Sequence, residues 1–421
     1  MTVHPILAAL RKHKAGAILI ALQIALTLAI VCNALFIIGH RLERLNRPTG
    51  VQESDLFIVQ QSWVNTPNES EPDAADKLDA MQLEDLAALR HTSGIASVSA
   101  INSLPLLGSA WNGFVSLDHF DSYDSANQGM VRTTFYFGDD QMFTTLGLRV
   151  IAGRAFTSAD VTHKLRRDNT APSVVVLTKP LADKLFPNGD AVGKAIYFIG
   201  SKPVVVVGVV DPVQTPSKND SSWSNSFAYN AVLVPQRLDA GRTNYAVRAE
   251  PGRLDEAMRA ARATLYSVNP MRVLDRDSIT SFATIRQDAY AGDVGMAFIL
   301  SLVCLILIAV TAVGIVGMTS FWVSQRYRQI GVRRALGARK IDILHYFQIE
   351  NLFIASFGVL LGIFVAFELN WWLMSHYEID RLPTLYVLVC ALLVFAIGQG
   401  AVFVPALKAS KVPPMAAVRA T

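Results

Sequence analysis

Four long apolar runs constrain the fold of this 421-residue chain more than any other feature of its sequence. Roughly 20 apolar residues in a helix cross the hydrocarbon core of a bilayer, and each run is about that long or longer. Hydrophobic residues make up 52% of the chain and charged residues 17%, which argues against a purely soluble protein. The first run is too long for a signal peptide and lacks a convincing cleavage site, so we interpret it as an uncleaved anchor. The predicted spans are residues 15–39, 293–320, 351–369 and 384–405.

Between the first two spans, residues 40–290 have the composition of a water-soluble domain, with charged residues, prolines and Asn/Asp/Ser clusters throughout. Both ends of this region show the order strand, helix, strand. The predicted elements are 55–60, a helix through 83–89 that ends near Gly94, and 95–101 at one end, and 245–249, 254–266 and 271–274 at the other. An insertion at about 130–230 separates the two units and contains β-branched runs. The pattern predicts a split ferredoxin-like βαβ/βαβ subdomain with a strand-rich inserted subdomain.

The predicted fold class is therefore an α-helical membrane protein with four transmembrane helices and a large α+β extracytoplasmic domain. Four spans place residues 1–14, 321–350 and 406–421 on one side of the membrane, and residues 40–290 and 370–383 on the other. The first group is basic, and short basic segments beside spans stay in the cytoplasm. We expect cytoplasmic N and C termini, a short amphipathic N-terminal helix, a cytoplasmic tail, and a domain that is periplasmic or extracellular.

Small residues recur at helical spacing in two of the predicted spans. They are Ala17, Ala21, Ala25 and Ala29 in the first span, and Gly358, Gly362 and Ala366 in the third. Such stripes let two membrane helices approach closely, although alanine is also simply common in membrane helices. Glu368 follows beside two tryptophans, which is typical of the water interface; an intramembrane functional carboxylate is the alternative.

The sequence contains no motif for nucleotide, nucleophilic or metal-dependent catalysis. The nearest approach to a phosphate-binding loop, residues 189–195, has the wrong spacing and lacks the Ser/Thr that holds magnesium. No Gly-x-Ser-x-Gly and no His-Glu-x-x-His occurs, and the eight histidines are scattered. The three cysteines lie in apolar runs, so no disulfide framework is proposed. We predict no enzyme and no metal site, although a triad assembled from distant residues leaves no sequence trace.

A basic segment, residues 324–342, connects the second and third predicted spans. Six arginines and lysines alternate with apolar residues before the first acid, Asp342, and Gly337 is predicted to end a short helix. Within it, residues 329–338 (QIGVRRALGA) resemble the cytoplasmic motif of the MacB/FtsX-type ABC transporter permeases. Segments between 136 and 209, among them 153–157 and 185–187, resemble that family's periplasmic core, and residues 405–419 resemble its C-terminal motif.

The resemblance implies a permease subunit without ATPase activity of its own, in the bacterial inner membrane, serving efflux or export by mechanotransmission. Only 14 residues precede the first span, so we expect the ATPase, with its ATP and magnesium, to be a separate polypeptide. The implied partners are that ATPase, a second permease chain in a homodimer or heterodimer, a periplasmic adaptor protein and membrane lipids, with no nucleic acid. The implied coupling residues are Arg326, Arg328, Gln329, Ile330, Gly331, Val332, Arg333, Arg334, Ala335, Leu336, Gly337 and Ala338.

Two positions depart from the family pattern. Gln329 replaces a usual Glu, and Arg339 replaces the Ser or Thr that opens the next helix, a cap that contributes ~1 kcal/mol. Several alternatives remain open at the level of the sequence: lipoprotein release or control of cell-wall hydrolases within the same family, a membrane-anchored receptor that transports nothing, and a membrane-bound hydrolase.

Overall fold

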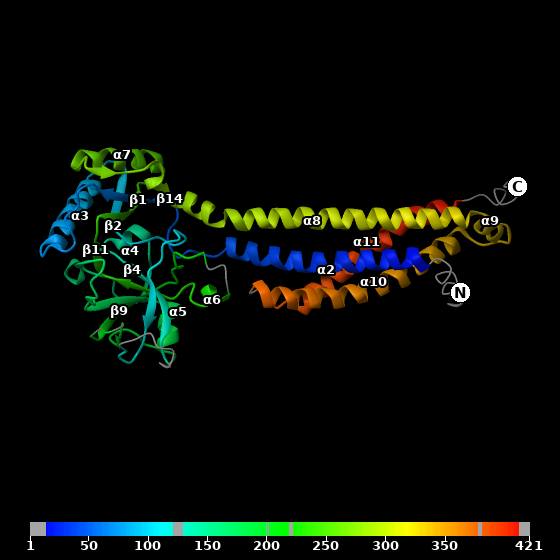
Figure 1. Cartoon of the computed structure of the whole chain (residues 1–421), viewed down its shortest axis with the longest axis horizontal. Helices are drawn as coiled ribbons and strands as arrows, with labels where there is room; N and C mark the ends of the chain where they lie inside the picture. The colour runs from blue at the N-terminus through cyan, green and yellow to red at the C-terminus, as the bar shows by residue number, and fades with distance from the viewer. Residues whose placement is uncertain are drawn as a thin grey trace. The chain divides into compact units, whose positions relative to one another are not determined.

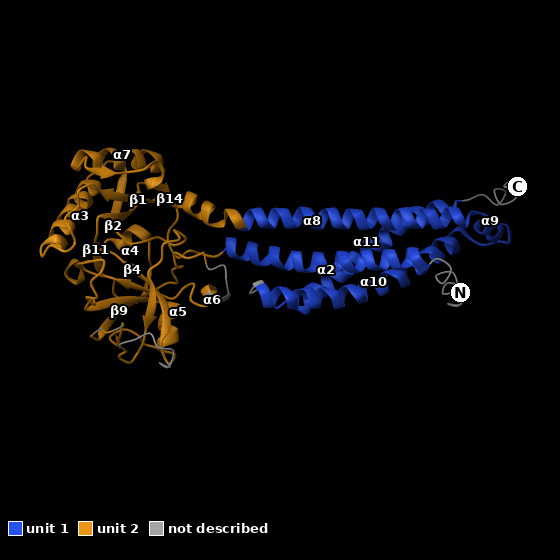
Figure 2. Cartoon of the chain, viewed as in Figure 1, with its two compact units in different colours: residues 1–46, 293–421 blue, residues 47–292 orange. Residues whose placement is uncertain are grey.

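A computed structural model describes residues 14–120, 129–198, 200, 202–218, 222–377 and 381–411. The chain forms two compact units (Figure 2). We call residues 1–46 with 293–421 the helical unit, and residues 47–292 the mixed unit. All but the last residue of the predicted N-terminal helix over 1–14 and most of the predicted tail over 406–421 lie outside the described residues, as does part of the 370–383 loop.

The helical unit contains four helices that are long and apolar enough to cross a membrane (Figure 1). They are α2 (Lys14–Leu45), α8 (Phe282–Gln325), α10 (Lys340–Tyr377) and α11 (Thr384–Ser410), and the short α9 (Tyr327–Ala335) separates α8 from α10. The helices extend beyond the predicted spans 15–39, 293–320, 351–369 and 384–405, because apolarity marks only the part of a helix suited to lipid. Helical hydrogen bonding continues into the polar flanks, so α8 begins within the predicted 40–290 domain.

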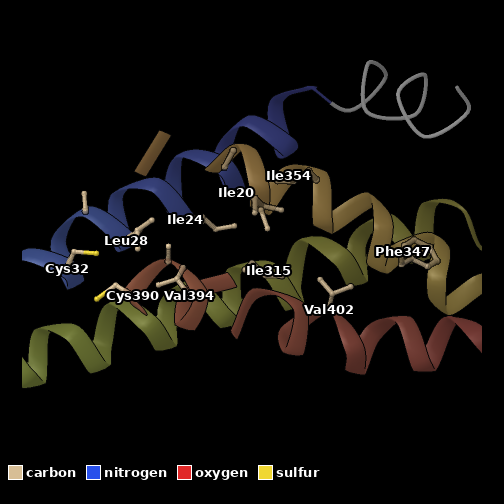
Figure 3. Packing of buried hydrophobic residues seen from close by; sticks show 14 of the residues in the cluster. Ile20, Ile24, Leu28, Cys32, Ile315, Phe347, Ile354, Cys390, Val394 and Val402 are labelled. Atoms are coloured by element: carbon tan, nitrogen blue, oxygen red, sulfur yellow. The ribbon is translucent and has the colours of Figure 1, made fainter. Parts of the chain in front are cut away.

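Helix α2 packs at the centre of this unit. Half of its most apolar stretch is buried in the structure, compared with 17% for α8. The buried side chains of α2 meet those of the other three helices in one apolar cluster (Figure 3). The labelled members are Ile20, Ile24, Leu28 and Cys32 of α2, Ile315 of α8, Phe347 and Ile354 of α10, and Cys390, Val394 and Val402 of α11.

Polar contacts join α2 to α8 at several points along the two helices. Near one end, Arg41 and Arg44 of α2 both bind Asp293 of α8, with 3.3 Å between Arg44 Nη2 and Asp293 Oδ1. Farther along, the hydroxyl groups of Thr27 and Thr311 lie 2.7 Å apart. Interhelical hydrogen bonds of this kind are favoured in membrane proteins, where hydroxyl groups have few other partners.

The mixed unit begins and ends with the two predicted strand–helix–strand units. The first comprises β1 (Leu56–Trp63), α3 (Ala74–Arg90) and β2 (Ile95–Ala100), and the second β12 (Arg242–Ala249), α7 (Leu254–Val268) and β13 (Arg272–Val273). They form an antiparallel sheet in the order β13-β1-β12-β2, and β14 (Ile279–Ser281) also pairs with β1. Counted along the two units, this order is 4-1-3-2, so the predicted ferredoxin-like arrangement is confirmed.

One face of this sheet forms a core with α3 and α7. Alternate strand residues such as Phe57 and Val247 pack against Leu86 of α3 and Ala261 of α7. Beside this core a buried ion pair joins Asp85 of α3 to the end of the sheet. Its cation is Arg272, and Gln61 and Tyr245 donate further hydrogen bonds to Asp85.

A second sheet fills the insertion between the two units. The elements of the insertion, in chain order, are β3 (Asn112–Val115), β4 (Val131–Phe137), α4 (Met142–Leu146), β5 (Val150–Gly153), β6 (Thr162–Leu165), β7 (Val174–Thr178), α5 (Lys179–Leu185), β8 (Ala195–Ile196), β9 (Val204–Val210), α6 (Ser222–Asn225), β10 (Ala231–Val234) and β11 (Gln236–Asp239). The main sheet has the order β3-β4-β10-β7-β9-β5 with β8 on β9, while β6 and β11 form a separate parallel ribbon.

The insertion is therefore wider than the predicted 130–230. Its first strand, β3, has four residues, includes a glycine and is mostly exposed or half-buried, so it shows no alternation of apolar and polar residues. This strand is defined by its pairing with β4, because four residues are too few to show a sequence pattern that predicts a strand. The ribbon strand β11 likewise follows β10 after a single residue, Pro235, and was not predicted.

Candidate functional site: the basic segment between α8 and α10

The basic segment begins where α8 ends. Regular helix stops at Gln325, and Arg326 has φ −101° and ψ 11°, outside the helical region, before α9 starts at Tyr327. Backbone hydrogen bonds on both sides bridge this break, from Arg326 N–H to the Trp322 carbonyl and from Ile330 N–H to the Arg326 carbonyl. The segment is thus a separate short helix that is hydrogen-bonded to α8 through one residue.

One side of α9 is anchored to the helical unit. Ile330 and Gly331 are buried, and Ile330 belongs to the apolar cluster around α2. The guanidinium of Arg326 makes a buried ion pair with Glu350 of α10, at 2.8 Å from Nη1 to Oε2, and also donates to the Tyr346 hydroxyl at 3.3 Å. These contacts show that Arg326, which we predicted as a contact for a partner, is bound within the chain.

A further cation contributes to this anchor. The Arg333 guanidinium lies over the ring of Tyr346, 5.1 Å from its centroid, while Arg333 itself stays exposed. A cation above an aromatic face contributes about 0.5–1 kcal/mol at an exposed site. Arg326, just before α9, and Arg333, in its last turn, therefore both contact Tyr346, and these contacts hold the two ends of α9 against α10.

The other side of α9 and the turn after it expose apolar and basic side chains together. Leu336 is 84% exposed, and Val332 and Ile341 are about half exposed. Arg328 and Gln329 are also exposed, as are Ala335 and Gly337, and Ala338 is half-buried. The Nε of Arg334 has no hydrogen-bond partner within the described part of the chain. We call Arg328, Val332, Leu336 and Ile341 the exposed face of the segment.

The end of α9 is fixed by Gly337, as the sequence predicts. Gly337 has φ +99°, the left-handed region that favours glycine. Its N–H binds the Arg334 carbonyl, and the next N–H, of Ala338, binds the Arg333 carbonyl. This pair of bonds is the Schellman arrangement, which satisfies the last carbonyls of a helix.

A carboxylate caps the start of α10, where Arg339 stands in place of the family's usual Ser or Thr. The Asp342 carboxylate accepts a hydrogen bond from the Arg339 backbone N–H at 2.9 Å. Asp342 is the third residue of α10, so this bond is the carboxylate half of a capping box. Asp342 therefore caps the Arg339 N–H, a different donor from the first-turn N–H groups that a Ser or Thr hydroxyl at position 339 would bind.

The two predicted stripes of small residues meet each other. A Cβ added to Gly358 of α10 would lie 2.8 Å from the Ala21 carbonyl oxygen, and one added to Gly362 would lie 3.0 Å from Ala25 Cα. One turn on, Asn33 of α2 donates to the Ala366 carbonyl at 3.1 Å. The remaining members also lie at the core: Ala29 is buried and Ala17 packs against the cluster around α2.

Some residues of the site could not be found from sequence motifs. Glu350 and Tyr346 lie on α10, well beyond the predicted coupling residues, and only the fold brings them to Arg326 and Arg333. A weak signal existed for Glu350, because it is one of only two acids in the predicted cytoplasmic segments between spans. An acid among many arginines is a natural candidate for an ion pair.

Two family models match the chain. Residues 18–264 match the MacB-like periplasmic core domain, and residues 301–414 match the FtsX-like permease C-terminal region. The chain is 28% identical over 296 residues to YvrN, an uncharacterized ABC transporter permease of Bacillus subtilis (strain 168), across 68% of this chain and 69% of YvrN. It is 31% identical over 237 residues to the macrolide export ATP-binding/permease protein MacB of Shewanella sp. (strain ANA-3).

That second alignment spans 54% of this chain but 34% of the MacB protein, so the chain matches about a third of that relative's length. Among solved structures, the periplasmic region of MacB from Actinobacillus actinomycetemcomitans is 18% identical with a TM-score of 0.34, covering 58% of this chain and 97% of that one. Because one family model accounts for more than half of the sequence, the chain belongs to the MacB/FtsX family of ABC transporter permeases, membrane proteins with an extracytoplasmic domain.

Proposed function

We propose that this chain is the permease subunit of an ABC exporter, in which a separate ATPase subunit pushes on α9 and so moves the mixed unit. The carrying observation is the two-sided character of α9. Its exposed face combines Val332 and Leu336 with Arg328, while its opposite side is held by Ile330 and by the Arg326–Glu350 ion pair. Force applied to the exposed face therefore passes to α8 and α10 through packed contacts.

The exposed face has the chemistry of a protein interface. Buried interface centres are apolar, arginine is enriched in them, and a leucine that is 84% exposed gains from being covered. The partner would bring ATP and magnesium, and this chain would bind neither. The partner surface should therefore offer an apolar groove with carboxylates at its rim.

The proposed orientation places α9 and both termini in the cytoplasm and the mixed unit outside. It is supported by the concentration of arginine and lysine in residues 324–342, since short basic segments beside spans are retained in the cytoplasm. A second permease chain, and in Gram-negative cells a periplasmic adaptor, would complete the assembly. The name of one relative, a macrolide export ATP-binding/permease protein, supports export over the other roles.

A photo-crosslinking amino acid at Leu336 tests the partner. In native membranes, ultraviolet light should join this position to a polypeptide that carries the ATP-binding motifs of an ABC ATPase. The matched control is Val313, which is 71% exposed but lies within the most apolar part of α8 and should yield no such product. If the chain is a membrane-anchored receptor, no ATPase should be crosslinked at either position. That outcome would contradict the proposal.

Variants of α9 test coupling in the assembled complex. Gly331→Pro removes a helix hydrogen bond and introduces a clash that costs ~3 kcal/mol. Arg333→Glu combined with Arg334→Glu reverses the charge. Both should abolish the stimulation of ATP hydrolysis by the permease and the transport that depends on it, while membrane insertion persists. Unchanged coupling in both variants would contradict the proposal.

Cysteine labelling tests the orientation. The native cysteines are buried in the structure, so a cysteine introduced at Asp183 or Leu336 reports its own side of the membrane. A membrane-impermeant maleimide should label Asp183→Cys in intact cells, but Leu336→Cys only after permeabilisation. The reverse pattern would place α9 outside and remove the ATPase from its reach.

A further inference from the structure

Three potential metal ligands from three elements meet within the mixed unit. Asp79 of α3, His163 of β6 and Asp239 of β11 each contribute one ligand atom, and these atoms lie within 4.8 Å of one another. The parallel register pairs His163 with Arg237, so Asp239 lies two residues farther along the neighbouring strand. Two residues is one period of a strand, which brings the His163 and Asp239 side chains to the same face of the ribbon, toward α3.

Hydrogen bonds hold the side chains of the cluster, and one further carboxylate lies near His163. Both oxygens of Asp79 accept hydrogen bonds from Arg237, at 2.7 Å from Nε and 2.9 Å from Nη2. His163 Nδ1 lies 2.8 Å from Asp239 Oδ2, and its other ring nitrogen lies 3.6 Å from Asp76 Oδ1. In protein metal sites, a ligating histidine commonly donates its second N–H to a carboxylate, and ligating carboxylates are themselves hydrogen-bonded.

Asp239 retains an unused acceptor in a buried position. The residue is 1% exposed, and its Oδ1 has no hydrogen-bond partner among the described residues. A buried carboxylate oxygen without a donor is costly, and a bound cation removes that cost.

The charges of the cluster suit a divalent cation. Asp76, Asp79 and Asp239 are three carboxylates, and among the described residues Arg237 is the one guanidinium paired with them, which leaves two negative charges when His163 is neutral. Imidazole nitrogen combined with carboxylate oxygen is a ligand set suited to zinc, whereas calcium and magnesium prefer oxygen alone. Arg237 does not exclude the ion, because a carboxylate oxygen that accepts one hydrogen bond keeps a second lone pair.

We propose that Asp79, His163 and Asp239 bind a divalent transition-metal cation of the zinc type, with Arg237 orienting Asp79. Since α3 belongs to the ferredoxin-like subdomain and β6 and β11 form the separate ribbon, the ion cross-links these two parts of the mixed unit. The apolar contact of Trp63 and Leu78 with Leu165 already joins the same elements. The metal would strengthen this junction.

Zinc titration of the full-length protein tests the site. The chain is purified in detergent, treated with a chelator, and titrated with zinc chloride in a calorimeter. We expect one zinc ion per chain, and at least tenfold weaker binding after His163→Ala or Asp239→Asn. The matched controls His91→Ala and Asp183→Asn remove the same side-chain types from exposed positions and should bind as the wild type does.

A second measurement separates binding from misfolding. Zinc should raise the thermal unfolding midpoint of the wild type and of both controls, but not that of His163→Ala. This variant should fold, because His163 is on the edge of the cluster with 32% of its side chain exposed. The proposal is overturned if the folded wild type takes up no stoichiometric zinc at micromolar concentration, or if the His163→Ala, Asp239→Asn double variant binds it equally well. In either case the cluster is an ion-pair network only.

Discussion

Two buried arginine–carboxylate pairs, one in each unit, have the same chemistry and different surroundings. In the mixed unit, Arg272 binds Asp85 at 2.8 Å, with the two side chains 0% and 1% exposed. In the helical unit, Arg326 binds Glu350 at 2.8 Å, with the side chains 11% and 2% exposed. The distances are the same, so the difference lies in what surrounds each pair.

The Asp85 pair is embedded in a complete network. Gln61 donates to Asp85 at 2.5 Å, Arg272 donates to Gln61 Oε1, and the Tyr245 hydroxyl donates to Asp85 at 3.0 Å. Gln61, Tyr245 and Arg272 lie on neighbouring strands of one sheet. In the part of the chain that the structure describes, the Arg326–Glu350 pair has one further hydrogen-bond partner, Tyr346, and it lies at the break between two helices. The first pair therefore fixes a fold, whereas the second holds a segment that other forces can displace.

The largest effect should follow from breaking the enclosed pair. Asp85→Ala leaves Arg272 charged and buried without its partner, which costs ~3–5 kcal/mol of unfolding free energy. Urea unfolding of the full chain, followed by limited proteolysis of the mixed unit, measures this loss. Asp183→Ala, which breaks an exposed ion pair with Lys179, should cost under ~1 kcal/mol. Equal shifts in the two variants would remove the distinction between enclosed and exposed pairs.

Breaking the second pair should release α9 and leave the rest of the chain folded. Glu350→Gln removes a charge-assisted hydrogen bond of ~1.5–3 kcal/mol. Trypsin should then cut at Arg328, Arg333 or Arg334 about 10–100 times faster, since every 1.4 kcal/mol is a factor of ten. Glu368→Gln, an exposed glutamate on the same helix, is the control and should leave the rate unchanged. If the rate is unchanged in Glu350→Gln as well, the pair does not hold the segment.

A substitution in the stripe of small residues on α10 tests how closely this helix packs on α2. Gly358→Leu forces a side chain against the Ala21 backbone, which should destabilise the helical unit by ~1–3 kcal/mol. Denaturation in mixed detergent micelles reports this change. The control Gly317→Leu places the same side chain on α8, where an added Cβ has open space, and should have little effect.

The smallest effect concerns the turn after α9. Gly337→Ala places a Cβ at φ +99°, which costs ~1–2 kcal/mol and weakens the end of the helix. Hydrogen exchange at the Ala338 amide, bonded to the Arg333 carbonyl, should accelerate about tenfold. Gly400→Ala within α11 is the control, because its added Cβ has open space and its φ is not positive. An unchanged exchange rate would mean that the turn does not depend on glycine.

The sequence predicts what depends on neighbouring residues and misses what depends on distant ones. Four spans follow from apolar length, and the end of α9 follows from the backbone freedom of Gly337. The stripes at Ala21 and Gly358 were each predicted, but their direct contact depends on two helices far apart in the chain. The bond between Asp85 and Arg272 joins residues 187 positions apart, so no local pattern contains it. The Asp79–His163–Asp239 cluster was missed for the same reason.

The contacts along α8 restrict how this helix can move. Asp293 is bound to α2 at one point, Thr311 at a second, and Arg326 just beyond its end is bound to α10. Asp293 and Thr311 are 18 residues apart, roughly five turns at 3.6 residues per turn, so they share one face. Rotation of α8 about its own axis would break both contacts with α2, whereas a tilt that carries α2 along preserves them. An inserted residue between the two, which turns the helix by about 100°, would put them out of phase.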